Sequence, residues 1–355
     1  MATPEHPILK PSDPSRVFGF RSLNGIYLRE WGVKFLLAGC ALMSILTTLA
    51  IVVVLFTEAT RFFHADQVVC DGVYVATSTR ETAGDTVLCP ECGASHILPA
   101  SVTFYDFITG TEWNPLIGKE TDKKFGVWAL ISGTLIVSLI AMLVAIPLGL
   151  VTAIYLSEYA HPRVRAILKP TLEVLAGIPT VVYGFFALMV ITPSLQFFHD
   201  GFNTFNATAA GLAVGVLCLP IVSSLVEDAL QAVPRSLREG GYGMGATKFE
   251  VSTKIVLPAA LSGIMSAFLL AVSRTVGETM IVALAAGSRP HLTVDPRDDT
   301  QTMTGWMVQM ALGDNSNFDM TYLSMYAVAA VLFVITMSLT ISGNIVRNRF
   351  REEYQ

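Results

Sequence analysis

Charged residues are scarce in this chain. Only 14% of its 355 residues are Asp, Glu, Lys or Arg, whereas 52% are hydrophobic. Soluble domains carry about 25% charged residues, so the composition excludes that class and predicts a protein that crosses a membrane several times. The net charge of −5 gives no support for a nucleic-acid partner.

Several catalytic motifs are also missing. The sequence has no Gly-x-x-x-x-Gly-Lys-Ser/Thr phosphate loop, no His-Glu-x-x-His and no Gly-x-Ser-x-Gly. No second carboxylate or histidine falls at catalytic spacing inside the apolar segments, which disfavours an intramembrane enzyme built on Glu278 or His161. We therefore expect that the protein is not an enzyme, and that any ATP hydrolysis on which it depends is supplied by another polypeptide.

Long apolar runs are abundant. A helix needs about 20 residues to cross about 30 Å of hydrocarbon. Six segments are long enough, namely residues 33–57, 127–156, 172–191, 207–226, 260–287 and 322–346. Basic residues gather before the first segment, in residues 161–169 and 235–254, and after the last segment, which predicts that both termini are cytoplasmic.

One apolar segment, residues 260–287, contains two charged residues, Arg274 and Glu278. A charged side chain at the centre of a membrane costs about 2.5 to 3.5 kcal/mol, so it is normally kept only where it faces protein, water or a substrate. Positions i and i+4 share a helix face, and the two side chains are therefore expected to meet. They form either part of a functional site or an ion pair that only holds helices together.

The loop before this segment, residues 238–258, is expected to contain a short helix. Residues 247–256 are amphipathic, with Phe249, Thr253 and Val256 spaced for one helical face. A proline near the end of the loop is expected to lie close to the start of the next span.

A second pattern in the loop consists of Glu239, Gly245 and the run Ile255-x-Leu257-Pro258. It resembles the EAA loop of ABC importer permeases, in which the loop forms the coupling helix that docks on the ATPase. The two residues after the glutamate are glycines here instead of the family's alanines. Each glycine in a helix interior costs about 0.8 to 1 kcal/mol relative to alanine, so the first turn of the coupling helix is expected to be loose or to form only against its partner.

Further stretches narrow the resemblance to the permeases of phosphate-specific ABC importers. Residues 107–115, 175–186 and 274–280 look like segments of those permeases, and the Glu-Thr-Met ending of the last stretch is closer to the PstC-type subunit than to the PstA-type subunit. The resemblance implies an all-α membrane protein with the six-transmembrane-helix fold of a type I importer permease. It makes Arg274 and Glu278 the charged pair of the translocation path, where a planar guanidinium suits phosphate oxygens and a carboxylate could hold it when no anion is present.

The same resemblance implies partners in a bacterial cytoplasmic (inner) membrane. They are a PstA-like sister permease, two copies of a PstB-like subunit that uses ATP and Mg²⁺, a PstS-like extracytoplasmic phosphate-binding protein, and membrane lipids. No cofactor bound by this chain itself is expected. Molybdate, tungstate and sulfate are alternative substrates, because a lone arginine does not identify its anion, and a membrane sensor or scaffold is the alternative of a different class.

The expected organisation has five parts. They are a cytoplasmic segment (1–32), a first transmembrane helix (33–57), an extracytoplasmic loop (58–126), a permease core (127–346) and a cytoplasmic tail (347–355).

Part of the extracytoplasmic loop, residues 65–98, looks like an insertion against the family pattern. Within it, residues 68–77 alternate enough to predict a short strand or hairpin arm. The insertion also contains Cys70, Cys89 and Cys92, with His96 close by. Three thiols and a histidine suit a tetrahedral zinc site, whereas a disulfide with one cysteine left over is the alternative on an oxidising side of the membrane, and reduced thiols are a third.

Overall fold

The computed structural model describes residues 23–63, 67–70, 73–76, 86–88, 95–97, 102–116, 123–313 and 320–349. The chain divides into two compact units, residues 1–54 and 55–355. The described part of the first unit belongs to one long helix, α1 (Leu23–Phe62), whose last turns lie in the second unit.

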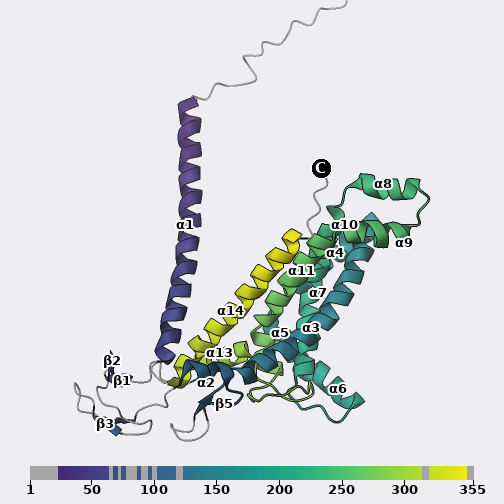
Figure 1. Ribbon diagram of the computed structural model, residues 1–355. Helices are drawn as coiled ribbons and strands as arrows, with labels where there is room; N and C mark the ends of the chain where they lie inside the picture. The colour runs from purple at the N-terminus through teal and green to yellow at the C-terminus, as the bar shows by residue number, and fades with distance from the viewer. Residues whose placement is uncertain are drawn as a thin grey trace, which may run out of the picture. The chain divides into compact units, whose positions relative to one another are not determined.

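The second unit is mainly helical (Figure 1). Its helices, with π-helical turns marked η, are α2 (Phe104–Thr109), α3 (Trp128–Ile154), η3 (Tyr155–Tyr159), α4 (Pro162–Ala176), α5 (Thr180–Phe186), η4 (Ala187–Ile191), α6 (Thr192–Phe198), α7 (Ala207–Gln231), α8 (Arg235–Gly243), α9 (Lys248–Glu250), η5 (Val251–Val256), α10 (Leu257–Ala259), α11 (Leu261–Val276), α12 (Met280–Ala285), α13 (Met303–Leu312) and α14 (Met320–Arg349). Its short strands are β1 (Gln67–Cys70), β2 (Val73–Ala76), β3 (Thr86–Leu88), β4 (Ser95–Ile97), β5 (Trp113–Asn114) and β6 (Lys124–Phe125).

In the described part of the chain, five helices are long and apolar enough to cross a membrane. A sixth span results if the bent pair of helices Lys248–Ala259 and Leu261–Val276 counts as one. The number agrees with the six segments expected from the sequence.

Two of those segments do not form single continuous helices over their expected ranges. The third span was expected at residues 172–191, but its helix begins at Thr180, because Gly177 and Pro179 separate it from α4. The fifth was expected at residues 260–287, but α11 ends before Gly277 and the chain resumes as the short helix α12. Both corrections have the same cause: glycine and proline are the poorest helix formers, and proline also lacks a backbone donor.

The centre of the bundle is the contact between α3 and α7, where small residues let the two helices approach closely. A Cβ atom added to Gly149 would lie 2.6 Å from Cγ1 of Val222, and one added to Gly211 would lie 2.7 Å from Cβ of Ile140. Buried alanine and valine side chains of both helices fill this core, and α11 packs against it. Figure 1 shows these helices running side by side.

A second cluster is aromatic and lies at the end of the bundle opposite α8 (Figure 1). Phe62, Phe107, Trp113, Phe125 and Trp306 are all buried there. Neighbouring rings meet edge to face, with the two indole centroids 5.3 Å apart. Residues 107–115, one of the stretches that resemble the phosphate-specific permeases, include β5. They therefore form part of a rigid scaffold at this end of the bundle.

The strands form three antiparallel pairs, β1 with β2, β3 with β4, and β5 with β6. The first pair confirms the predicted hairpin arm. Cys70 lies in β1 and His96 in β4, but the side chains of both are outside the described residues, as are Cys89 and Cys92 altogether. A zinc site, a disulfide and free thiols all stay predictions.

Candidate functional site

Arg274 and Glu278 lie on either side of the break in the fifth span. α11 ends between them, and the backbone N–H of Glu278 donates to the carbonyl oxygen of Thr275 at 3.2 Å. Among the described residues no hydrogen bond or ion pair joins the two charged side chains. The expectation that they share one helix face is therefore wrong. The hydroxyl of Thr304 stabilises the break by donating to the carbonyl oxygen of Glu278 at 2.6 Å.

The region of the two charges contacts α7 through Thr275, whose Oγ1 lies 3.5 Å from Sγ of Cys218. Arg274 is exposed, whereas Glu278 is only 8% exposed. The guanidinium is therefore the more accessible of the two charged groups.

Tyr183 closes the other break, between α4 and α5. Its ring is buried, and its hydroxyl donates to the carbonyl oxygen of Leu175 at 2.9 Å. This side chain therefore holds two helices together across a break.

The coupling loop, which we define as residues 238–258, begins inside α8. The guanidinium of Arg238 donates to the carbonyl oxygens of Val233 at 2.6 Å and Leu230 at 2.7 Å. It also lies 3.1 Å from the carboxylate of Glu158 in η3. One side chain thereby attaches α8 to the end of α7 and to the extension of α3.

The glycines of this loop have different roles. Gly241 is buried, and a Cβ atom there would lie 2.6 Å from Cδ1 of Ile255, whereas a Cβ atom on Gly240 would meet nothing within 4 Å. α8 starts at Arg235, so Glu239 and both glycines lie inside a helix. Close packing against η5 offsets the low helix propensity of glycine.

Gly245 ends α8 in the left-handed conformation, with φ at +83°. Its N–H donates to the carbonyl oxygen of Tyr242 at 2.9 Å, and the N–H of Ala246 donates to that of Gly241 at 3.2 Å. This is the hydrogen-bond pattern of a Schellman motif, which favours glycine at the left-handed position. The glycine six residues after Glu239 therefore has a structural role, because it ends α8.

The next helix begins with a capping box in which Thr247 and Glu250 bond to each other's backbone N–H groups. Its expected face is wrong, because Phe249 is 67% exposed while Val256 is fully buried. The cause is the π-helical stretch η5, whose i to i+5 hydrogen bonds rotate the residues after it relative to an α-helix. Val251 joins Val256 on the buried face instead.

The remaining residues of the family pattern connect the loop to the bundle. Ile255 covers Gly241, and Leu257 packs against the main core. Pro258 lies in the first turn of α10, just before the chain bends by 70° into α11, so its expected place near the start of a span is confirmed.

One charged cluster was not found from the sequence. Glu227 of α7 is fully buried, with its carboxylate 2.7 Å from Nε of Arg165 and 3.1 Å from Nζ of Lys169. Lys169 also lies 2.9 Å from Asp228. Hydrogen bonds to Asp228 and then to Glu227 raise the pKa of the Lys169 amine above its usual value. The sequence does contain a signal for this cluster. Glu227 and Asp228 directly follow the apolar segment 207–226, and they are expected on the same side of the membrane as the basic loop of residues 161–169.

Comparison with known proteins places these features in a family. A family model described as binding-protein-dependent transport system inner membrane component matches residues 145–352. A probable ABC transporter permease protein, YqgH of Bacillus subtilis, is 32% identical over 69% of this chain and 78% of its own length. The phosphate transport system permease protein PstC of Mesorhizobium japonicum is 33% identical over 65% of this chain and 75% of its own length. A chain of the solved MetNI methionine ABC transporter is 18% identical, with a TM-score of 0.48, over 64% of this chain and 95% of that chain.

Proposed function

This chain belongs to the binding-protein-dependent transport system inner membrane component family, and we propose that it is the PstC-type permease of an importer for inorganic phosphate. It is a multi-pass membrane protein and a transport subunit, which in this family works with an ATPase and a substrate-binding protein. The observation that carries the proposal is the exposed guanidinium of Arg274 at a break in a membrane span, which has no partner in the part of the chain that the structure describes. The 33% identity to a phosphate permease supports phosphate as the anion.

Arg274 receives the anion in the translocation path. Its planar guanidinium presents a fork of donors that matches phosphate oxygens, and these charge-assisted hydrogen bonds are roughly twice as strong as neutral ones. The side chain is exposed and has no partner within the described residues. In this arrangement, with Glu278 apart from it, Arg274 binds the anion without first breaking an ion pair.

Glu278 regulates the availability of Arg274. The break at Gly277 lets the two side chains move relative to each other, because they do not belong to one rigid helix. When the path holds no anion, the carboxylate approaches the guanidinium and neutralises it. The arrangement with the two groups apart is the one that accepts phosphate. An ion pair that only fastens this chain to a sister permease is the competing role.

The coupling loop is the docking surface for a PstB-like ATPase subunit. Three large side chains of the loop face outward: Tyr242 is 43%, Met244 is 83% and Phe249 is 67% exposed. Exposed apolar groups gathered on one loop indicate a protein interface. The complete transporter contains two copies of this ATPase, which use ATP and Mg²⁺, a PstA-like sister permease and a PstS-like binding protein.

The chain lies in the bacterial cytoplasmic membrane with both termini and the coupling loop inside. The clusters of basic residues support this orientation. The aromatic end of the bundle and the strand pairs are then extracytoplasmic, where the binding protein delivers its substrate.

Uptake into membrane vesicles tests the proposal. Vesicles that contain this chain with its candidate sister permease, ATPase and binding protein are supplied with ATP and labelled phosphate, with excess sulfate or molybdate as competitor. We expect uptake that resists both competitors. Arg274→Gln should abolish it while assembly and basal ATP hydrolysis persist. Arg163→Gln is the matched control, because this arginine is exposed on α4, away from the break.

Three outcomes would contradict parts of the proposal. Uptake of molybdate, tungstate or sulfate in place of phosphate would keep the transporter and reassign its substrate. Normal phosphate uptake by the Arg274→Gln variant would leave the pair with a structural role only. No ATP-driven transport of any oxyanion by an assembled complex would favour a sensor or scaffold.

A further inference from the structure

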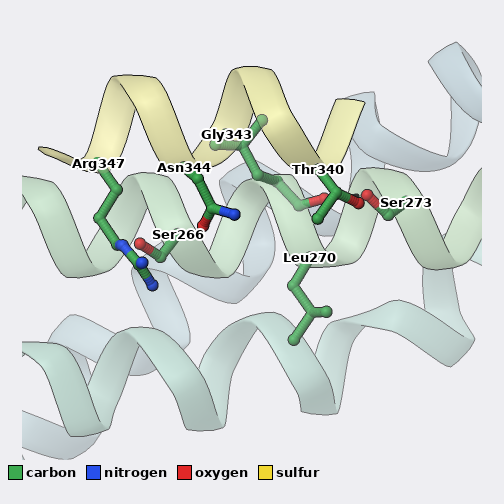
Figure 2. A pocket seen from close by; sticks show the side chains of 8 residues that line it. Ser266, Leu270, Ser273, Thr340, Gly343, Asn344 and Arg347 are labelled. Carbon is green, nitrogen blue, oxygen red and sulfur yellow. Dashed lines mark hydrogen bonds between the residues drawn. The ribbon is translucent and has the colours of Figure 1, made fainter. Parts of the chain in front are cut away.

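A groove of about 290 Å³ lies between α11 and α14. Ser266 and Leu270 line it from α11, and Gly343, Asn344 and Arg347 line it from α14 (Figure 2). Neither Arg274 nor any residue of the coupling loop lines it. The groove is therefore separate from the site proposed for phosphate.

The groove follows from how the two helices meet. Gly343 is their point of close approach, since a Cβ atom there would lie 2.9 Å from Cδ1 of Leu269. Around this contact the facing side chains include short ones such as Ser266 and Thr340, which leave space between the helices. Leu270, which is 55% exposed, forms part of an apolar wall.

The polar end of the groove offers hydrogen-bond donors and no negative charge. Asn344 and Arg347 are three residues apart on one face of α14, and Figure 2 shows both side chains directed toward Ser266. Within the described residues neither the amide nor the guanidinium has a partner. The Ser266 hydroxyl already donates to the carbonyl oxygen of Ser262 at 2.9 Å. No acidic side chain is among the lining residues, so the groove is complementary to an anion.

We propose that this groove binds one anionic phospholipid of the surrounding membrane. The lipid phosphate accepts hydrogen bonds from Arg347 and Asn344, while an acyl chain lies along Leu270. Two observations favour a lipid over a soluble anion. The groove opens between two apolar helices, and its arginine lies near the end of the last span, where a basic residue faces lipid headgroups. This inference is independent of which substrate the transporter moves.

Lipid retention tests the proposal on the full-length chain purified with its partner subunits in mild detergent. The complex is incubated with mixed micelles that contain phosphatidylglycerol and phosphatidylcholine, and native mass spectrometry counts the lipids that stay bound. We expect one phosphatidylglycerol to be retained in preference to phosphatidylcholine. Arg347→Gln should lower its retention about five-fold, the effect of one basic residue near a membrane surface. Asn344→Leu should lower it less.

Two further variants separate the groove from general effects. Ser266→Phe fills the groove without changing charge, so it should also lower retention, whereas Arg163→Gln removes an exposed basic residue elsewhere and should leave it unchanged. Equal retention by all variants would overturn the proposal. So would binding of inorganic phosphate at Arg347 with no retained lipid, or an Asn344→Cys variant that cross-links to another protein chain. Phosphate uptake is measured in parallel, so that failure here is distinguishable from failure of the proposed transport function.

Discussion

Opposite charges lie next to the apolar bundle in two regions of the molecule, and the regions differ in whether those charges pair with each other. In the cluster between α4 and α7, the buried Glu227 lies within 3.1 Å of both Arg165 and Lys169. At the break in the fifth span, Arg274 and Glu278 have no such contact with each other. The difference separates charges that hold helices together from charges that have no such pairing with each other.

Burial distinguishes Glu227 from Arg274. A fully buried carboxylate must be compensated, because the desolvation of an ion costs several kcal/mol. Glu227 is fully buried and has two basic partners. Arg274 is exposed, so it does not need a partner from its own chain.

The largest effect is expected from removing both basic partners of Glu227. The double variant Arg165→Met with Lys169→Met should lower the free energy of unfolding by about 3 to 5 kcal/mol, because an uncompensated carboxylate stays buried. Equilibrium unfolding in detergent measures this. Adding Glu227→Gln should restore most of the loss, and Arg163→Met is the control. A double variant as stable as the control would show that the cluster does not hold α4 against α7.

A smaller loss is expected at Arg238, which joins α8 to the bundle through two carbonyl oxygens and Glu158. Arg238→Gln should lower the free energy of unfolding by about 2 kcal/mol, the range for hydrogen bonds to a charged group. It should also reduce phosphate uptake per ATP hydrolysed, because α8 becomes free to move without α7. The exposed Arg235→Gln of the same helix is the control, and equal coupling ratios in both variants would contradict this role.

Arg274→Gln should change stability by less than about 0.5 kcal/mol, the usual range for an exposed residue with no special contact. The same unfolding measurement checks this value, and uptake should be lost in the same preparation. A loss of stability comparable to that of the Arg165 and Lys169 variant would remove the distinction between the two regions.

The smallest effect concerns a third arrangement, the exposed pair of Asp295 and Arg297. Hydrogen bonds from the Arg297 side chain and backbone lower the pKa of Asp295 from 3.8 to about 2. Because the pKa of Asp295 is lower in the folded protein, the ionised pair stabilises the fold fully above pH 3.8. This stabilisation is lost as the pH falls toward 2. Proteolysis of residues 287–302 should therefore become faster over this interval. Proteolysis of the Asp295→Asn variant should not depend on pH in this interval. If the variant and the parent show the same dependence of proteolysis on pH, the role of this pair is contradicted.

The helical membrane fold and the chemistry of the coupling loop could be predicted from local sequence. Hydropathy marks the apolar spans, and Thr247, Gly245 and Pro258 act through their own backbone and near neighbours. The helix face that includes Phe249 could not be predicted, because an α-helical spacing was assumed across a π-helical stretch. Gly240 and Gly241 look equivalent in sequence, and only the packing of Ile255 distinguishes them.

The sequence by itself determined that the chain spans a membrane, that it has the pattern of an importer permease and that two charged residues lie within its fifth apolar segment. These properties depend on composition and on residues close together along the chain. Only the tertiary structure decided that Arg274 and Glu278 are separated by a helix break and that Glu227 is paired with Arg165. The reason is physical: the free energy of a charge in a membrane protein depends on which partners and how much water surround it, and the fold brings those partners from distant parts of the chain.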